Sequence, residues 1–550
     1  MKKAQSALCA ILSAIFLIMI PFSLIATASD GDAPDICVIS DVHFKHASIE
    51  KGTNAATDET ELYFRAGIQG QMDYESNAIV KSFMSEFSES DSDILLVAGD
   101  ITDGNIKNHR EIAEMFSALE ALGKKVFVIN GNHDITDESR NGYTSPDAFA
   151  EIYEDFGYSE ALSRDESSLS YTAELGDGYR LIAIDSCIYG EDSGRITDET
   201  MSWIDNQFAQ AKNDGVTLVA MMHHSLLSHM SCYSLTGMQI EYCDRFAKKL
   251  AENGVSLIFT GHFHANDITE AHSDGGKKIY DVMTGSLITY PNAYRQVSFT
   301  NDKVNITTSY VESVDVNDLP DCFSDREKSL IDGDFREYAR GFLYAGIENW
   351  INSYLGSSRK ICKLLNIERD SELGKKLDEM MPYIAEALTM PLYGESNSLE
   401  AIASLSGNAI TKSDYKSISE IAGAIFCGIY SGDETIGQNS IEVKVLSNAI
   451  HAAIVYAVCG MSGQLENDKV VAKASEISYA SAVADDIAVQ LAAPVINGIT
   501  CDAYAPGDLN VSLDVNESGI FQFDSAPISF LQYMIKLVKN LFEIFGVAYF

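Results

Sequence analysis

Residues 94–100 have the sequence Ile-Leu-Leu-Val-Ala-Gly-Asp, an apolar run that ends at a glycine followed by a carboxylate. A run of this length, rich in branched aliphatic residues and bounded by glycine, is typical of a strand buried on both faces. Four other apolar runs end in a similar way. The predicted strands are therefore 36–40, 94–98, 126–130, 216–222 and 255–260.

A short polar motif follows each predicted strand. The motifs are Asp41-Val-His43, Gly99-Asp100, Gly131-Asn132-His133-Asp134, His223-His224 and Gly261-His262-Phe263-His264. Helical periodicity over 77–87, 109–122, 199–211 and 238–252 separates the strands, and Asn108 with Glu111 predicts a capping box for the second helix. Alternating strands and helices indicate an α/β sheet, in which ligands bind beyond the carboxyl ends of the strands. We therefore expect the five motifs to meet at one edge.

The motifs offer carboxylate oxygen, amide oxygen and imidazole nitrogen, without a thiolate. These ligands suit Mn, Fe, Zn or similar ions better than they suit a structural cysteine site or an all-oxygen calcium site. Two such ions about 3.5 to 4 Å apart generate a hydroxide at neutral pH, bind a phosphoryl oxygen and stabilise the leaving oxygen. Taken singly, each residue is more often a cap or a satisfied polar group, but an ordered set is far more specific. Hydrolysis of a phosphoester is the expected reaction.

The order of these motifs resembles the pattern of the calcineurin-like metallophosphoesterase family, which is D-x-H, G-D, G-N-H-[DE], H and G-H-x-H. The resemblance covers approximately residues 35–311. It implies an α/β fold, a two-sheet sandwich flanked by helices. It also implies two divalent or mixed-valence metal ions as cofactors. The residues implied for one ion are Asp41, His43 and His264, and those for the other are Asn132, His223 and His262.

The same resemblance assigns two further roles. Asp100 would bridge the two ions, and His133 would be the catalytic residue near the leaving group, as a general acid or a transition-state stabiliser. In the His223-His224 doublet either imidazole could be the ligand. Related H-H-P segments favour His223, although Ser225 replaces the proline here. Asp134 is expected to orient His133 or a ligand by a hydrogen bond.

Other positions narrow the assignment. Purple acid phosphatases, a branch of the same superfamily, carry a tyrosine three residues after the bridging aspartate, and this chain has Asp103 there. A ferric ion bound by tyrosinate is therefore not expected. His46, His109, His229 and His272 belong to no motif. We expect His109 in the first turn of a helix and the other three on loops.

The N-terminus has the layout of a signal peptide. Lys2 and Lys3 precede an apolar run over 7–25, and Ala26-Thr27-Ala28 is a small-residue cleavage site. We expect a signal peptide over 1–28 and a secreted or cell-envelope-associated protein. An uncleaved membrane anchor is the alternative, because the apolar run is long enough to span a bilayer.

The length and charge of the chain limit its organisation and its substrates. With 550 residues, 46% of them hydrophobic and 22% charged, the chain is expected to be globular with two domains. The formal net charge of −41 repels polyanions, so extended nucleic acid is an unsuitable partner. A small phosphoester can still bind, because two metal ions dominate the local field.

After about residue 312 the pattern becomes helical. The predicted helices are 334–354, 372–388, 417–430, 441–458 and 470–492. We therefore expect a metallophosphoesterase domain over 29–318, a mainly α-helical accessory domain over 319–527 and a C-terminal amphipathic helix over 528–550. If helical, 528–545 has a wide apolar face that could contact a membrane or the cell envelope, or pack as the last core helix.

Together these features predict an exported dinuclear-metal phosphohydrolase that uses a metal-bound hydroxide as nucleophile. The motifs do not separate a monoesterase from a diesterase. One alternative is a non-catalytic cell-surface binding or scaffold protein that retains the fold, and a missing ligand would have favoured it. Another alternative makes the helical region an adhesin.

Overall fold

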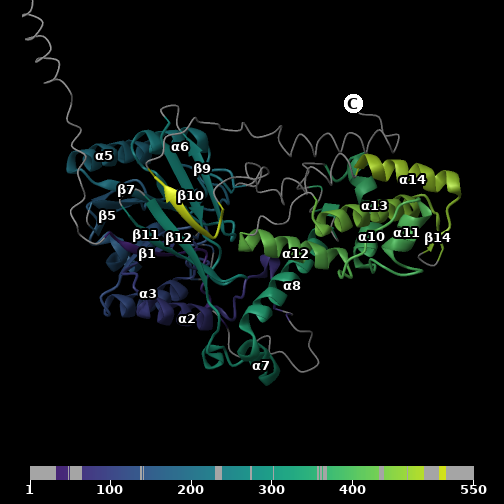
Figure 1. Ribbon diagram of the computed structural model, residues 1–550, viewed down its shortest axis with the longest axis horizontal. Helices are drawn as coiled ribbons and strands as arrows, with labels where there is room; N and C mark the ends of the chain where they lie inside the picture. The colour runs from purple at the N-terminus through teal and green to yellow at the C-terminus, as the bar shows by residue number, and fades with distance from the viewer. Residues whose placement is uncertain are drawn as a thin grey trace, which may run out of the picture. The chain divides into compact units, whose positions relative to one another are not determined.

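The computed structural model describes most of the chain between residues 33 and 515 (Figure 1). The described residues are 33–46, 49, 63, 65–136, 139, 142–176, 178–229, 238–272, 276–300, 303–355, 358–359, 362, 368–432, 439–466, 469–487 and 507–515. The expected signal peptide over 1–28 and the expected C-terminal helix over 528–550 lie outside them.

The first sheet has the strand order β15-β12-β11-β1-β2-β3. Its strands are β1 (Asp35–Ile39), β2 (Ile94–Ala98), β3 (Lys125–Ile129), β11 (Ala293–Phe299), β12 (Lys303–Tyr310) and β15 (Asn510–Asp514). The strands β1, β2 and β3 are parallel, and the other neighbours pair antiparallel.

The second sheet has the order β4-β5-β6-β7-β8-β10-β9. Its strands are β4 (Ser163–Arg164), β5 (Tyr171–Gly176), β6 (Tyr179–Ile184), β7 (Thr217–Met222), β8 (Leu257–Thr260), β9 (Asp267–His272) and β10 (Lys278–Met283). The central strands β6, β7, β8 and β10 are parallel. Thus β1, β2, β3, β7 and β8 confirm the five predicted strands, and their carboxyl ends carry the five motifs.

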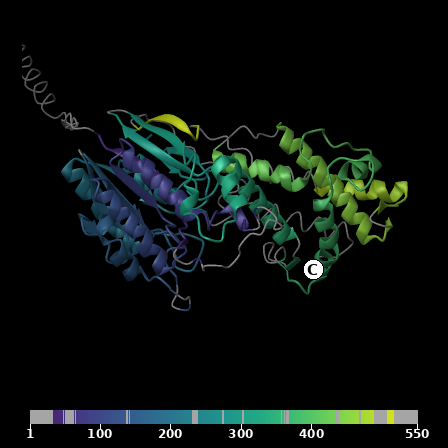
Figure 2. The same ribbon diagram turned by 90° about the horizontal axis from the view of Figure 1, so that it is seen from below.

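Helices flank both sheets, as expected. They are α2 (Ser76–Glu89), α3 (Ile106–Glu120), α4 (Pro146–Ile152), α5 (Asp198–Asp214) and α6 (Cys243–Glu252). In Figure 1, α2 and α3 lie against the first sheet while α5 and α6 flank the second, and Figure 2 shows α2 in purple across the first sheet. The architecture is therefore the predicted two-sheet metallophosphoesterase-like fold.

Two helix starts differ from the prediction. The side chain of Asn105, not Asn108, caps α3 by accepting a hydrogen bond from the Lys107 amide at 3.0 Å. The expected capping box is wrong because Asn108 lies inside the first turn, where its side chain is buried. The helix expected from residue 238 begins only at Cys243, because Gln239 and Ile240 form β-bridges to other loops.

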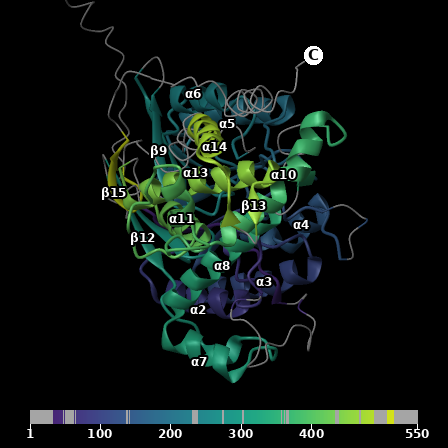
Figure 3. The same ribbon diagram turned by 90° about the vertical axis from the view of Figure 1, so that its right-hand side faces the viewer.

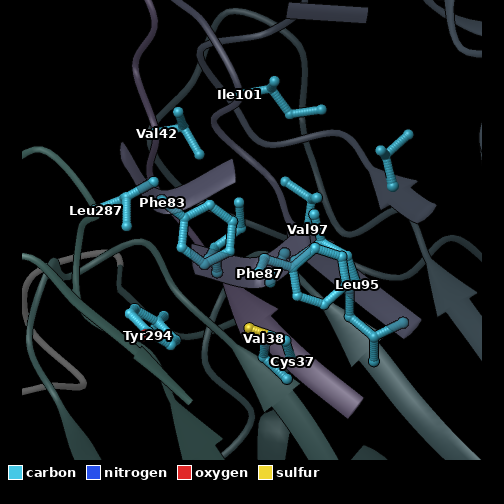
Figure 4. Close-up of a cluster of buried hydrophobic side chains, with 14 of the residues drawn as sticks. Cys37, Val38, Val42, Phe83, Phe87, Leu95, Val97, Ile101, Leu287 and Tyr294 are labelled. Carbon is cyan, nitrogen blue, oxygen red and sulfur yellow. The ribbon is translucent and has the colours of Figure 1, made fainter. Parts of the chain in front are cut away.

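Apolar side chains hold α2 against the first sheet (Figure 4). Phe83 and Phe87 of α2 lie beside Leu95 and Val97 of β2, and the ring centroid of Phe83 is 5.1 Å from that of Tyr294 on β11. All five side chains belong to one buried cluster. This packing holds α2 against β2, and the second motif extends from the carboxyl end of β2.

The C-terminal region is mainly helical. Its helices are α7 (Asp325–Gly333), α8 (Phe335–Leu355), α10 (Glu372–Thr389), α11 (Leu399–Leu405), α12 (Ile418–Ser431), α13 (Ile441–Met461) and α14 (Ala474–Ile487). Figures 1 and 3 both show α13 between α11 and α14. A two-stranded sheet of β13 (Leu465–Glu466) and β14 (Lys469–Val470) precedes α14, so the helix predicted from residue 470 begins later.

The helix α13 is the centre of this region. Among the residues that the structure describes, it alone is long and apolar enough, by length and composition, to cross a membrane. The core helix of a globular domain passes the same test, and 72% of the apolar window is buried inside the protein. Its side chains form the second main core cluster together with residues of α10, α11 and α12.

The strand β15 was not among those predicted from the sequence, and it lies far from the other strands of its sheet along the chain. After the helical region, β15 pairs antiparallel with β12, so residues 510–514 form an edge of the first sheet. The buried Arg295 of β11 holds the segment that precedes β15. Its guanidinium donates hydrogen bonds to the Asp508 carbonyl at 2.5 Å and to the Met283 carbonyl at 2.8 Å. The helical region is therefore inserted before the last strand of this sheet.

Candidate metal centre

The loops that follow β1, β2, β3, β7 and β8 bring the predicted ligands together. Five of these residues have left-handed backbone conformations that non-glycine residues rarely adopt, with φ of 50° at Asp41, 41° at His43, 49° at Asp100, 74° at His262 and 64° at His264. Each such residue costs about 1 to 3 kcal/mol and persists only where the surroundings hold it. The sharp turns aim the side chains into one site.

Asp41, His43 and His264 form the first group. Their ligand atoms lie within 4.8 Å of one another. The Nε2 atom of His264 is 3.2 Å from Nε2 of His43 and 3.4 Å from Oδ1 of Asp41. All three side chains are buried. These are the residues expected around one ion.

Asn132, His223 and His262 form the second group. The Nε2 atom of His223 is 3.1 Å from both Oδ1 of Asn132 and Nδ1 of His262. On the other side of its ring, Nδ1 of His223 donates a hydrogen bond to the Ala98 carbonyl at 2.9 Å. In the neutral imidazole that bond leaves Nε2 unprotonated, and the neutral imidazole is the form that binds a metal.

Asp100 lies between the two groups. Its Oδ2 atom is 3.2 Å from Nε2 of His223 and 3.7 Å from Nε2 of His43. Its Oδ1 atom accepts a hydrogen bond from the His133 amide at 2.8 Å. Gly131 must lack a side chain, because a Cβ atom there would collide with the Asp100 carboxylate. The position of Asp100 is the one expected of a bridging ligand.

The site fits a pair of metal ions in its donor atoms. Among the described residues, Nε2 of His262 and Nδ1 of His264 are buried without a hydrogen-bond partner. Ring nitrogens of neighbouring histidines also face each other at 3.1 and 3.2 Å. Buried polar atoms normally have partners, so imidazoles arranged in this way are suited to sharing cations.

Nearby carboxylates raise the pKa of two of the candidate ligand histidines, His43 and His223. Burial lowers the pKa of His43, but Asp103, Asp100 and Asp41 raise it more, to about 9. Burial likewise opposes the shift at His223, where Asp100 raises the pKa to about 9. A ligand imidazole must be neutral, so metal binding would release these protons and strengthen as the pH rises.

The two histidines of the doublet His223-His224 have different surroundings. While His223 faces Asp100 and Asn132, Nδ1 of His224 is hydrogen-bonded to the Ser186 hydroxyl at 2.9 Å. The ring of His224 packs beside that of His262, with centroids 4.4 Å apart. Burial is the main cause that lowers its pKa to about 3. His224 is therefore a neutral side chain that packs against the ring of His262.

His133 is placed differently from the ligand histidines. Its side chain is 48% exposed, and its ring centroid is 5.2 Å from that of His43. Its Nδ1 atom is 3.9 Å from Oδ1 of Asp103. Asp100 raises the pKa of His133, but burial and His43 outweigh it, so the net direction is downward. An exposed imidazole at the rim can reach a bound substrate.

Asp103, noted in the sequence only for not being a tyrosine, orients His43. Its Oδ1 atom accepts a hydrogen bond from Nδ1 of His43 at 2.8 Å, and its Oδ2 atom is 2.5 Å from Nζ of Lys45. Lys45 also contacts Asp73 at 2.8 Å. Asp103, His43 and His133 form a further group of possible ligands. No sequence signal identified this chain of contacts, because Lys45 and Asp73 lie outside the motifs.

Asp134 orients backbone rather than the His133 side chain. Its carboxylate accepts hydrogen bonds from the amides of Gly131 at 2.8 Å, Thr102 at 2.9 Å and Ile101 at 3.2 Å. It thereby ties the loop after β3 to the loop after β2. His109 lies in the first turn of α3, as predicted, and its Nε2 atom is 3.1 Å from the Asp134 carbonyl. The sequence had connected His109 with no motif.

Comparison with known proteins identifies the first part of the chain. Residues 34–266 match the family model described as calcineurin-like phosphoesterase. This part of the chain is a calcineurin-like phosphoesterase domain. The match includes residues 41–264 and thus all five motifs. This domain is that of a metal-dependent phosphoesterase.

Curated relatives bear names of the same kind. A "Probable cyclic nucleotide phosphodiesterase" from Psychrobacter arcticus is 28% identical over 256 residues, which are 44% of this chain and 77% of that protein. A protein of the same name from Rhodococcus erythropolis is 26% identical, over 31% of this chain and 51% of its own length. The chain thus spans about half the length of the second relative.

Solved structures also align with the chain. A dimetal phosphatase from Danio rerio is 12% identical, covers 51% of this chain and 97% of its own, and has a TM-score of 0.38. Purple acid phosphatase PPD1 from yellow lupin is 12% identical, covers 51% of this chain and 52% of its own, and has a TM-score of 0.34.

Proposed function

We propose that this chain is an exported phosphodiesterase that hydrolyses small phosphodiesters, such as cyclic nucleotides, with two metal ions. The observation that carries the proposal is the position of Asp100, with one carboxylate oxygen 3.2 Å from His223 and 3.7 Å from His43. Export is supported by the sequence pattern of residues 1–28 alone.

We assign the ligands as the sequence predicts. Asp41, His43 and His264 would hold one ion, Asn132, His223 and His262 the other, and Asp100 would contact both. The chemistry that the ions supply when bound is Lewis-acid polarisation of the phosphoryl oxygens and activation of a water molecule. The metals themselves would be Mn, Fe, Zn or similar ions, because the donors are oxygen and nitrogen.

His133 is the proposed proton donor to the leaving oxygen. Its amide is hydrogen-bonded to Asp100, which fixes its backbone beside the metal ligands. Its imidazole remains partly exposed, so a bound substrate could reach it. A histidine can transfer a proton near neutral pH, and such a group contributes roughly 100-fold to 10,000-fold in rate.

Two features favour a diester over a monoester. The curated relatives are named as phosphodiesterases. In addition, the basic side chain Lys45 contacts the site through Asp103. Its Nζ atom is 2.5 Å from Asp103 and 2.8 Å from Asp73, so these two carboxylates balance its charge within the protein. A diester carries one negative charge where a monoester carries nearly two. The diester therefore needs less compensating positive charge in this acidic chain.

A substrate panel on the manganese-loaded protein tests the proposal. It should include 3′,5′-cyclic AMP, bis(4-nitrophenyl) phosphate, 4-nitrophenyl phosphate, 5′-AMP and a long single-stranded DNA. We expect kcat/KM for the small diesters to exceed that for the monoesters by about tenfold or more, which is about 1.4 kcal/mol of transition-state binding. The DNA should not be cleaved, because the net charge repels it. A preference for monoesters would refute the diesterase assignment.

A further inference from the structure

The last turn of α12 lies on the loop that carries His262 and His264. Asn266, two residues after His264, donates two hydrogen bonds to the Tyr430 carbonyl, from its backbone N–H at 3.1 Å and from Nδ2 at 2.9 Å. Asn266 is fully buried and Tyr430 almost so. The carbonyl at the end of a helix in the C-terminal region is thus satisfied by the metal-binding loop.

Gly432 allows this close approach. It ends α12 in the left-handed conformation, with φ of 71°, and a Cβ atom on it would lie 2.6 Å from the Asn266 carbonyl oxygen. Such a distance is well below van der Waals contact, and both atoms involved are fixed by backbone. Any side chain at position 432 would therefore push α12 and the loop apart.

The contact continues from Asn266 to the ligands of the first group. The Oδ1 atom of Asn266 accepts a hydrogen bond from the Gly285 amide at 3.1 Å. The next residue, Ser286, donates from its hydroxyl to the Asp41 carbonyl at 2.8 Å and from its amide to the His264 carbonyl at 3.4 Å. The end of α12 thus reaches the backbone of two of the three residues through one buried side chain.

Apolar packing reinforces the polar contacts. The ring of Tyr430 is 6.2 Å from that of Phe263, which lies between His262 and His264, and 6.1 Å from that of Phe426. Ala265 of the same loop is buried in one cluster with side chains of α8 and α12. The loop after β8 is therefore packed against both helices.

The second group is fastened differently. His223 is hydrogen-bonded to the Ala98 carbonyl, as described above, and the loop that follows it is held by Asp281 of β10. One Asp281 oxygen accepts hydrogen bonds from the amides of Leu226 at 2.7 Å and Leu227 at 2.8 Å. These contacts lie within the sheets. Of the second group, His262 shares the loop that α12 contacts, but the hydrogen bonds traced above reach the backbone of His264 and Asp41 and not that of His262.

We propose that the end of α12 is a positioning element for one of the two metal ions, the one assigned to Asp41, His43 and His264. The inference rests on the proposed ligand assignment. It gives the helical region a role in the metal centre: Tyr430, Gly432 and Asn266 hold the His264 loop and the Asp41 backbone in place. They do not touch the reacting atoms, so they act as positioning residues.

The test compares Gly432→Ala with Gly215→Ala. Gly215 ends α5 in the same left-handed conformation, with φ of 73°, but a Cβ atom there would meet nothing within 4 Å. Both substitutions carry the same backbone strain, and only the first breaks a contact. The full chain is titrated with Mn²⁺, and bound manganese is counted per chain. The electron paramagnetic resonance spectrum then separates a coupled pair from a single ion.

We expect Gly215→Ala to bind two ions with a coupled spectrum, and Gly432→Ala to retain one ion while affinity for the other falls about tenfold or more. Asn266→Ala keeps the backbone N–H bond but removes the two side-chain hydrogen bonds, to the Tyr430 carbonyl and from the Gly285 amide, without a clash. It should show the same selective loss, whereas Asn253→Ala at the end of α6 should not. Two ions bound with unchanged affinity in Gly432→Ala or Asn266→Ala would overturn the inference alone. Failure of the unsubstituted chain to bind two ions would overturn the proposed function and this inference with it.

Discussion

Each nitrogen of His43 has a distinct environment. Nδ1 donates to Asp103 at 2.8 Å, which leaves Nε2 free to face Asp100 and His264. A carboxylate behind a ligand imidazole fixes both its tautomer and its orientation, and makes it a stronger base. The residue three places after Asp100, Asp103, therefore orients a histidine, whereas a tyrosine at that place would itself be a candidate ligand.

The visible absorption of the iron-loaded protein tests whether Asp103 replaces a tyrosine ligand. In purple acid phosphatases the visible absorption arises from tyrosinate on ferric iron, and Asp103 occupies the corresponding place here. We expect the oxidised, iron-loaded protein to lack an intense visible charge-transfer band. The measurement is an absorption spectrum of the protein after iron loading and oxidation. A strong band that disappears when one tyrosine is changed to phenylalanine would show that the ligand assignment is incomplete.

His133→Ala should separate chemistry from metal binding. The side chain lies at the rim of the site rather than within either group of three ligands, so both ions should remain bound. Without a proton donor at the leaving oxygen, kcat should fall by about 100-fold or more. Metal content and kcat are measured on the same preparation, with His272→Ala on β9 as the control. A variant that loses metal but keeps its rate per occupied site would contradict the role.

At the scale of elements, the sequence predicts the carboxyl ends of five strands but not the cap of α3 or the end of β9. An apolar run that stops at glycine or a polar motif marks the end of a buried strand, so β1, β2, β3, β7 and β8 were located correctly. The cap of α3 at Asn105 was missed because Asn108 offered an equally good local signal. His272 was expected on a loop, but it ends β9.

His229 lies on the loop after β7, as predicted, and joins that loop to the second sheet. Its Nδ1 atom is 2.7 Å from Asp267 of β9 and its Nε2 atom is 3.2 Å from Asp281 of β10. Burial lowers the pKa of His229, but the two carboxylates raise it to about 10. A histidine whose pKa is raised on folding stabilises the protein fully below its unfolded pKa, about 6.5, and this contribution disappears as the pH rises towards 10.

The difference in unfolding free energy between the unsubstituted chain and His229→Gln should follow that window. We expect it to be greatest at pH 6, of the order of a few kcal/mol, and to shrink steadily between pH 6.5 and pH 10. Urea unfolding at several pH values measures it, and the difference between the two proteins cancels the titration of other groups. A difference that is constant from pH 6 to pH 10 would show that His229 is neutral in the folded protein.

At the scale of the whole molecule, the convergence of the five motifs was predictable because each motif directly follows a buried strand. The alternation of strands and helices places each motif at the carboxyl end of a parallel strand, whatever the lengths of the loops, and the structure brings these ends together from two sheets. The contacts from Asn266 to Tyr430 and from β15 to β12 join segments far apart in the chain. Neither has a repeating pattern, and β15, with the sequence Asn-Val-Ser-Leu-Asp, has only two apolar residues, so periodicity could not reveal them.

The central claim is that one carboxylate unites motifs from five strands into a two-ion site. Metal content and phosphodiesterase activity of Asp100→Asn test it most directly, with Asp165→Asn, which alters a buried carboxylate in the turn after β4, as the control. We predict that Asp100→Asn loses metal at both positions and retains less than about 1% of the activity, since one bridging ligand serves both ions. Two bound ions and full activity in that variant would contradict the account.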